Sequence, residues 1–252
     1  MRILSKIMAF VLAVAVLAGC SSSDKATSPV DELIKSMEDK KNFTIILYDM
    51  DIEGSLSETY KHKYKIITPP EDTMDSLAKP KEKKTKWYEV SERFFNIHAK
   101  DMGMEIAAKV DGKVRKQTAP PGYSNYVGNS QYGQWKTNNS GNSFWAFYGQ
   151  YAFMSNMIGL MNGPVYRSNY RDYRSNYRGV RPYYGSGSRK YGTFSSASKK
   201  MNPSFHQRVK NNSNFKSRVN NSVSRSSSAR KSRSGSRYSS GSRSRSSSSG
   251  GK

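Results

Sequence analysis

The sequence predicts an α+β fold: a small antiparallel sheet with one or two helices, followed by a long disordered basic tail. Apolar and polar side chains alternate with a two-residue period in several segments of residues 43–116, which indicates half-buried strands. A helical pattern precedes these segments. The last third of the chain has few aliphatic residues, so burial there cannot offset the entropy lost on ordering.

The compact domain is expected over residues 30–118, which is long enough to fold alone. Residues 31–41 carry apolar side chains at helical spacing and acids at their amino-terminal end, as in a short amphipathic helix. Residues 43–54 follow as a predicted strand that ends at a glycine. Four of its residues are predicted to share one face: Ile46, Tyr48, Met50 and Ile52.

The clearest alternation lies in residues 60–68, where three lysines occupy one face of the predicted strand. The opposite face carries Tyr60, His62, Tyr64 and Ile66. Residues 86–99 and 105–116 are predicted to be further strands. In the second of these segments, Asp111-Gly112 indicates a tight hairpin turn.

Two segments connect this domain to the tail. Residues 119–143 are rich in glycine, asparagine, serine and aromatic residues, and are predicted to be a linker. Residues 144–161 are strongly apolar and are predicted to form an apolar amphipathic helix. Such a helix completes a core, contacts a partner protein or lies on a membrane surface, and the sequence leaves these alternatives open.

Positive charge is concentrated near the C-terminal end of the chain. The formal net charge is +23. Residues 21–166 contain 19 Lys/Arg and 18 Asp/Glu, whereas residues 167–252 contain 21 Lys/Arg and one acid, Asp172. The sequence therefore predicts a nearly neutral body with a basic tail that contacts a polyanion.

The first 19 residues are predicted to be an export signal. Arg2 and Lys6 precede an apolar stretch, residues 7–18, that is too short to cross a hydrocarbon layer of ~30 Å. The residues at its end resemble the lipobox of bacterial lipoproteins at all four positions: Leu17-Ala18-Gly19-Cys20.

This resemblance implies a membrane anchor. In that family the cysteine is lipidated and the signal is cut before it, so Cys20 is implied to be the lipidated residue and the mature N-terminus. Lipid on Cys20 would hold the chain at a membrane of the bacterial cell envelope, with residues 20–29 as a flexible tether. Ser21 is similar to the residue at that position in outer-membrane lipoproteins, so the outer membrane is favoured where the organism has one. Because the chain has one cysteine, no disulfide is expected.

Residues 162–252 contain a tandem repeat and then a low-complexity tail. YRSNYRD at 166–172 is followed directly by YRSNYRG at 173–179. Residues 222–252 contain 16 serines among 31 positions, and disorder is expected from about residue 180 to the end. Tyrosine rings stack and guanidinium groups bind phosphates. The repeat is therefore predicted to bind polyanions through Tyr166, Arg167, Tyr170, Arg171, Tyr173, Arg174, Tyr177 and Arg178.

No group of residues in the sequence points to catalysis. His62, His98 and His206 lack the spacing of a metal site, and the first two are interpreted as strand residues. Asp49 and Asp51 lie on one face of a predicted strand and are interpreted as solvated surface acids. No cofactor or metal is expected, and the chain is interpreted as non-enzymatic.

The sequence thus predicts a membrane-anchored envelope lipoprotein whose basic disordered tail contacts anionic envelope polymer or lipid head groups. One alternative is an accessory subunit of an integral membrane complex, with a membrane protein as its partner. The other is nucleic-acid binding at the cell surface, since the Ser/Arg tail resembles the Arg-Ser segments of splicing factors. Contact with any polyanion is expected to weaken as salt is added.

Overall fold

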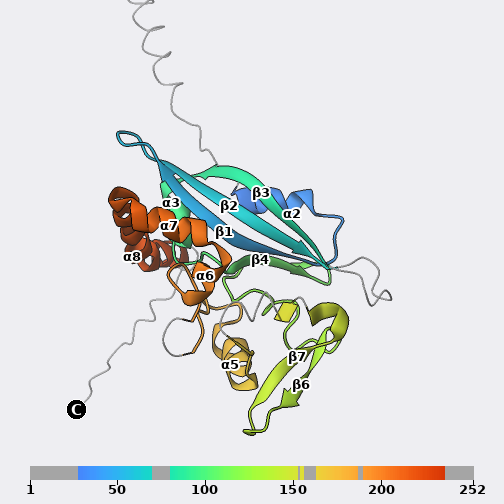
Figure 1. Cartoon of the computed structure of the whole chain (residues 1–252). Helices are drawn as coiled ribbons and strands as arrows, with labels where there is room; N and C mark the ends of the chain where they lie inside the picture. The colour runs from blue at the N-terminus through green and yellow to red at the C-terminus, as the bar shows by residue number, and fades with distance from the viewer. Residues whose placement is uncertain (1–27, 70–79, 153, 156–162, 187–189, 236–252) are drawn as a thin grey trace, which may run out of the picture.

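The computed structural model describes residues 28–69, 80–152, 154–155, 163–186 and 190–235 (Figure 1). Several of the sequence-based predictions concern residues outside this part of the chain: the signal segment 1–19, Cys20 with most of the tether, residues 156–161 and the tail residues 236–252.

A five-stranded antiparallel sheet, in the order β3-β2-β1-β4-β5, forms the centre of the fold (Figure 1). Asp111 and Gly112 connect β4 to β5 with φ angles of 49° and 78°, as a tight hairpin turn requires. The α+β fold class is confirmed, and so are the strands expected over 43–54, 60–68 and 105–116. The strands are β1 (Phe43–Glu53), β2 (Thr59–Thr68), β3 (Lys81–Val90), β4 (Glu105–Val110) and β5 (Lys113–Arg115).

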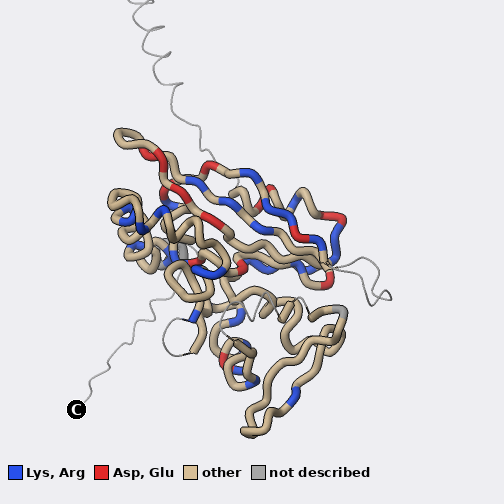
Figure 2. Tube along the Cα trace, in the orientation of Figure 1, with Lys and Arg blue, Asp and Glu red and all other residues tan. Residues whose placement is uncertain are grey.

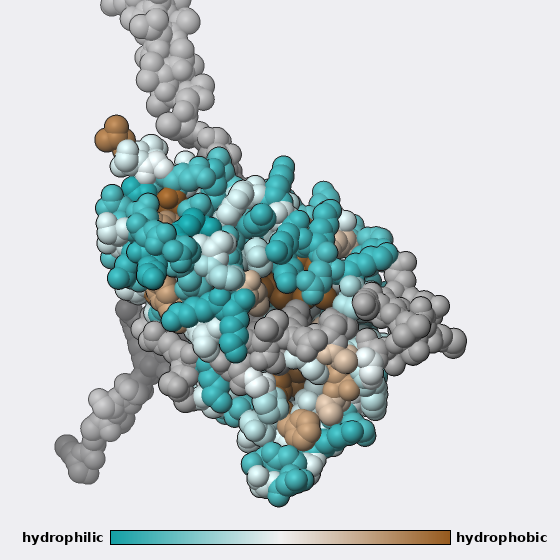
Figure 3. All heavy atoms as spheres, viewed as in Figure 1, coloured by the Kyte–Doolittle hydropathy of each residue, from teal (hydrophilic) through white to brown (hydrophobic). Residues whose placement is uncertain are grey.

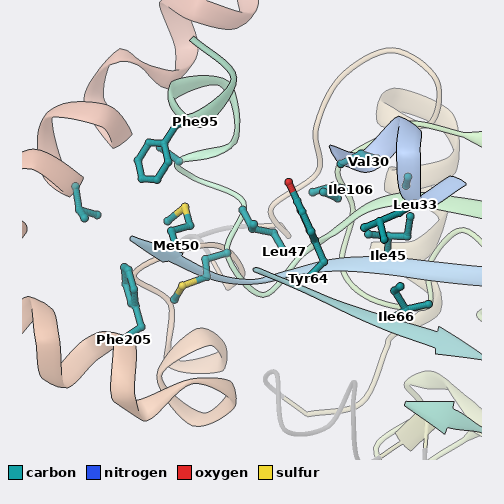
Figure 4. Packing of buried hydrophobic residues seen from close by; sticks show 14 of the residues in the cluster. Val30, Leu33, Ile45, Leu47, Met50, Tyr64, Ile66, Phe95, Ile106 and Phe205 are labelled. Atoms are coloured by element: carbon teal, nitrogen blue, oxygen red, sulfur yellow. The ribbon is translucent and has the colours of Figure 1, made fainter. Parts of the chain in front are cut away.

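Helices from both ends of the described chain pack on one face of this sheet and enclose the main core. Phe95, Phe205 and Phe215 come from three different helices and pack in one cluster with Met50 of β1 (Figure 4). Leu33 joins the same cluster from the amino-terminal helix. The helices that contribute to this core are α2 (Pro29–Ser36), α3 (Glu92–His98), α7 (Pro203–Asn211) and α8 (Ser213–Gly235). The short helix α6 (Ser196–Met201) packs instead in a separate cluster with Met104 and Tyr191.

Serine caps begin two of these helices. The Oγ atom of Ser28 accepts a hydrogen bond from the backbone N–H of Asp31 at 3.2 Å, and Ser91 caps the N–H of Phe94 at the same distance. The helix expected over 31–41 is confirmed as far as Ser36, where it ends. The strand expected over 86–99 is wrong beyond residue 90: its aromatic residues favour a strand locally, but the cap at Ser91 and the burial of Phe95 in the core favour α3.

A β-bulge in β1 changes which residues face the main core. The register shifts between Leu47 and Asp49, so Tyr48 is inserted as an additional residue opposite β2. Met50 belongs to the main core, whereas Ile46 packs on the opposite face of the sheet in a separate cluster with Tyr126. The prediction that Ile46 and Met50 share a face is therefore wrong, because a one-residue insertion reverses the alternation.

Residues 119–151 form a second layer on the face of the sheet opposite the main core (Figure 1). The segment expected to be a linker, 119–143, is mostly buried between 119 and 127 and then forms a strand. The helix expected over 144–161 is contradicted at its start, where residues pair in an antiparallel hairpin with Trp135 opposite Trp145. Both segments are ordered in spite of their glycine content, because their tyrosine and tryptophan side chains are buried. The new elements are β6 (Gly133–Thr137), β7 (Ser143–Phe147) and the short 3₁₀ helix η1 (Gly149–Tyr151).

The disorder expected from residue 180 onward is contradicted over much of 190–235, where α6, α7 and α8 form. The segment is poor in aliphatic residues, but Phe205, Phe215 and Val219 are each almost wholly buried. A few apolar side chains are enough to order a helix when they pack into the core of a sheet that is already formed by other segments. Among the described residues, no helix is both long and apolar enough to cross a membrane.

Candidate functional site

The tandem repeat forms one continuous helical segment beside the β6–β7 hairpin (Figure 1). The first copy gives α5 (Arg167–Asp172), and the second begins with a π-helix, η2 (Tyr173–Tyr177). The N–H of Arg178 donates to the carbonyl of Tyr173 at 2.9 Å, which closes the wider π-helical turn. The disorder predicted from about residue 180 begins after the repeat, and the structure shows the repeat itself as an ordered helical segment.

Three of the four tyrosines of the repeat, Tyr170, Tyr173 and Tyr177, pack in an aromatic cluster, whereas Tyr166 is half-buried and pairs through its backbone with Phe144. Tyr173 is completely buried and Tyr170 is 8% exposed. Ring centroids lie 5.3 Å apart for Tyr123 and Tyr173, and 4.8 Å apart for Tyr177 and Tyr183, in edge-to-face arrangements. Burial raises the pKa of both Tyr170 and Tyr173, so these phenols are neutral. The predicted contact of Tyr170 and Tyr173 with a polyanion is therefore wrong for the rings, which serve as a base for the helix.

The arginines of the repeat point away from this base. We call the five guanidinium groups of this segment the arginine surface: Arg167, Arg171, Arg174, Arg178 and Arg181. All are exposed except Arg178, which is partly buried. Within the described part of the chain, none of them lies within ion-pair distance of a carboxylate. The nearby Asp172 instead accepts hydrogen bonds from Asn176 at 2.8 Å and from Ser186 at 3.4 Å.

Aromatic rings hold the two outermost arginines. The guanidinium carbon of Arg181 lies 4.3 Å from the ring centroid of Tyr177, and that of Arg167 lies 5.7 Å from Trp135. Arg181 was not part of the sequence-based prediction because it lies two residues after the repeat ends. A single arginine in a basic segment, outside any repeat, does not by itself indicate a place on this surface.

Most other ordered arginines of the C-terminal region are neutralised within the molecule. Each of four arginine side chains in α7 and α8 meets a carboxylate of β1, of the turn before β2, of α3 or of the loop after α3. The pairs are Arg208 with Asp49 at 2.7 Å, Arg218 with Glu58 at 3.1 Å, Arg225 with Glu92 at 3.5 Å and Arg230 with Asp101 at 2.5 Å. The expectation that Asp49 is a solvated surface acid is wrong, because this carboxylate is 5% exposed and paired. The arginine surface therefore differs from the arginines of α7 and α8, because its guanidinium groups form no ion pair among the described residues.

The described histidines do not form a catalytic or metal-binding group. His62 is wholly buried on β2, where desolvation lowers its pKa well below the ordinary value. His98 lies in α3 instead of a strand and its Nδ1 is 2.8 Å from Asp101, and His206 lies in α7 with its Nε2 2.9 Å from the hydroxyl of Ser198. Among the described residues, no three His, Cys, Asp or Glu side chains could hold a metal ion.

A forked guanidinium presents several N–H donors in a plane and matches phosphate or carboxylate in two-point contacts. The five guanidinium groups lie on this helical segment and the turn that follows it, and can present such donors to a ligand with several negative charges. No protein-family model matches the chain, and neither a curated protein nor a solved structure is detectably similar to it. The function is therefore inferred from sequence and geometry.

Proposed function

We propose that the chain is a non-enzymatic bacterial envelope lipoprotein, anchored by lipid on Cys20, whose arginine surface binds anionic envelope polymer or lipid head groups. The observation that supports this most is the separation of roles within the repeat. Three of its four tyrosines pack in an aromatic core, and its arginines are exposed or partly buried without carboxylate partners among the described residues.

The physical argument is one of energetic cost. Like charges on one helical segment repel, and each costs a few tenths of a kcal/mol when no opposite charge is near. The aromatic cluster offsets that cost and keeps the segment rigid, so little side-chain and backbone freedom is lost when an anion binds. A free and pre-organised basic surface fits a ligand with many negative charges.

Replacing the charge on this surface tests the proposal. The triple substitution Arg171→Gln/Arg174→Gln/Arg178→Gln should lower the affinity for a purified envelope fraction by roughly tenfold or more, since each lost phosphate contact also removes counterion release. Co-sedimentation at several salt concentrations measures the effect.

A matched control removes the same charge elsewhere. Lys35→Gln/Lys113→Gln/Lys216→Gln changes three exposed lysines that lie outside the repeat and outside the β6–β7 hairpin beside it, and leaves the net charge equal to that of the arginine variant. If the control weakens binding as much as the arginine variant does, the interaction follows total charge and the proposed surface is wrong.

A further inference from the structure

An open cavity of about 410 Å³ lies where α7 and the start of α8 cover the end of β1. Figure 3 shows a hydrophilic surface around this part of the molecule, with a small apolar area between β1 and the helices. Ile52 and Phe215 contribute the apolar wall of the cavity, and its other lining residues are polar. Sites for small ligands have volumes of ~300–1,000 Å³ and a few polar groups beside an apolar surface. The cavity therefore has the size and the lining of such a site.

Hydrogen bonds within the protein fix the orientation of three amide side chains that line the cavity. The side-chain carbonyl of Asn212 accepts from the N–H of Phe215 at 3.0 Å, and that of Asn211 accepts from the amide nitrogen of Gln207 at 3.1 Å. Among the described residues, these contacts leave the Nδ2 groups of Asn211 and Asn212 and the Oε1 atom of Gln207 without a partner. The cavity therefore has two free donor groups and one free acceptor from its amides.

The carboxylate of Asp51 adds a second acceptor to the cavity. Its Oδ1 atom accepts from the N–H of Ile52 at 2.9 Å, and its Oδ2 atom has no hydrogen-bond partner among the described residues. Asp51 is half-buried, and this burial raises the pKa of its carboxyl against the opposing charge of Arg208. A partly desolvated oxygen without a donor is unfavourable, and a ligand hydroxyl would supply the missing hydrogen bond.

The charges around the cavity are unsuited to an ionic ligand. Arg208 is the basic residue of the cavity wall, and it is already paired with Asp49 at 2.7 Å and donates to the carbonyl of Met50 at 3.0 Å. Figure 2 shows acidic residues along this end of β1. An anion would therefore meet the carboxylate of Asp51 without an unpaired cation in the wall. A simple cation would satisfy the two acceptors and leave the two amide donors without acceptors.

We propose that this cavity binds one ring of a neutral saccharide. Adjacent hydroxyl groups of a sugar ring both donate and accept hydrogen bonds, which matches two free acceptors beside two free donor groups. The C–H groups of the same ring form an apolar surface that can pack on Ile52 and Phe215. The cavity lies away from α5 (Figure 1), and the proposal depends neither on the arginine surface nor on the lipid anchor.

Ordinary structural roles explain part of this arrangement. Asn212 lies between α7 and α8, and its side chain caps the first turn of α8. Gln207 and Asn211 are a hydrogen-bonded i,i+4 pair on an exposed face of α7, which stabilises that helix slightly. Neither role accounts for the unpaired oxygen of Asp51 beside these amides. The two explanations are separated by measuring binding in addition to stability.

Saturation-transfer difference NMR on the full chain tests the proposal, in a polyoxyethylene detergent that carries no sugar head group. The probes are two monomers, glucose and N-acetylglucosamine, and their trimers, maltotriose and chitotriose. At least one monomer and trimer pair should show saturation of its ring C–H protons. Binding is expected in the millimolar range, because hydrogen bonds to the ligand replace hydrogen bonds to water. Equal affinity of monomer and trimer indicates a site for a free sugar, whereas tighter binding of the trimer indicates a unit of a glycan chain.

Gln207→Ala/Asn211→Ala removes one free acceptor and one free donor from the cavity. It should weaken saccharide binding by about tenfold or more, since two ordinary hydrogen bonds are lost. Asn214→Ala/Asn220→Ala is the matched control: it removes two exposed amides of α8 that do not line the cavity, and it should bind as the wild type does. Asp51→Asn, which keeps the size of the side chain, should also weaken binding.

Absence of ring-proton saturation for all four saccharides at millimolar concentrations would overturn the proposal. Equal binding by Gln207→Ala/Asn211→Ala and its control would do the same. Putrescine and glucose 6-phosphate serve as ionic probes: if putrescine binds more tightly than every saccharide and loses that affinity in Asp51→Asn, the cavity is a cation site and the proposal is wrong. Loss of saccharide binding in Arg171→Gln/Arg174→Gln/Arg178→Gln and not in the cavity variants would also contradict it.

Discussion

At the scale of single residues, Glu105 shows how one buried carboxyl organises a loop. It is fully buried at the start of β4 and accepts hydrogen bonds from the backbone N–H groups of Gly122 and Ser124, at 3.0 and 3.2 Å, and from the hydroxyl of Ser124. Desolvation raises its pKa to about 8, although these hydrogen bonds and the charge of Arg115 oppose the shift. The loop 119–127 is thereby attached to the sheet.

This pKa predicts a specific pH dependence of stability. The pKa of Glu105 is higher in the folded state than in the unfolded state, so the folded state binds the proton more tightly. This contribution to the free energy of unfolding is fully present below about pH 4.5 and is lost as the pH rises toward 8. Glu105→Gln cannot ionise, so its free energy of unfolding relative to the wild type should rise between pH 5 and 9, by on the order of a few kcal/mol. Urea unfolding at each pH measures it. Glu89→Gln, at an exposed position, should show no such trend, and parallel curves for wild type and Glu105→Gln would contradict the assignment.

At the scale of elements, the long helix α8 is held to the sheet layer by a buried polar network as well as by apolar contacts. Asp101, which is fully buried, accepts hydrogen bonds from Arg230 at 2.5 Å, Tyr184 at 2.6 Å and Thr118 at 3.0 Å. Burial alone would raise the pKa of Asp101, but the charge of Arg230 and the hydrogen bonds from His98 and Tyr184 outweigh it and hold the pKa at about 2. The carboxylate therefore stays charged, and four segments of the chain meet on it.

The apolar part of this docking can be tested with two phenylalanines. Phe215 of α8 is 5% exposed, and its ring centroid lies 5.8 Å from that of Phe205. Phe215→Ala should lower the free energy of unfolding by about 3–5 kcal/mol through the lost burial and the cavity left behind. Phe194→Ala, at a position 40% exposed, should change it by no more than about 0.5 kcal/mol. Similar small effects for both, measured by urea unfolding, would mean that α8 is not part of the cooperative fold.

At the scale of the whole molecule, the large positive charge of the C-terminal region divides into two parts. Four arginines of α7 and α8 neutralise carboxylates of β1, α3 and the neighbouring loops, so this part of the charge stabilises the fold. The arginine surface keeps its charge free of carboxylates among the described residues. The basic region is thus in part a structural component of the body and not only a tail, and under the proposed function a polyanion meets an ordered surface.

The proposed anchor predicts where the whole molecule is found in a cell. In a bacterial host, the wild-type chain should fractionate with membranes, and mass analysis of its mature N-terminus should find acylated Cys20. Cys20→Ala should abolish the lipid and the cleavage before residue 20, while Ser21→Ala serves as a neighbouring control that keeps both. An unmodified wild-type product recovered in the soluble fraction would contradict the proposal.

Local patterns by themselves determined several elements of this protein. The turn at Asp111-Gly112 is set by two adjacent residues that tolerate positive φ, and the strand over 60–68 by an alternation that any half-buried sheet imposes. The tandem repeat is visible in the sequence, but the separation of its buried tyrosines from its exposed arginines depends on the helix that the structure shows.

Only the tertiary structure decided the rest, because each case depends on contacts between distant segments. The bulge at Tyr48 moves Ile46 and Met50 to opposite faces, and no residue type marks it. The segment around Phe95 became a helix because its ring enters the main core. Residues 196–235 became ordered because Phe205 and Phe215 enter the same core while their arginines meet carboxylates far away in the chain. Composition shows how few apolar side chains a segment has, whereas the tertiary structure determines whether those side chains are buried in a core.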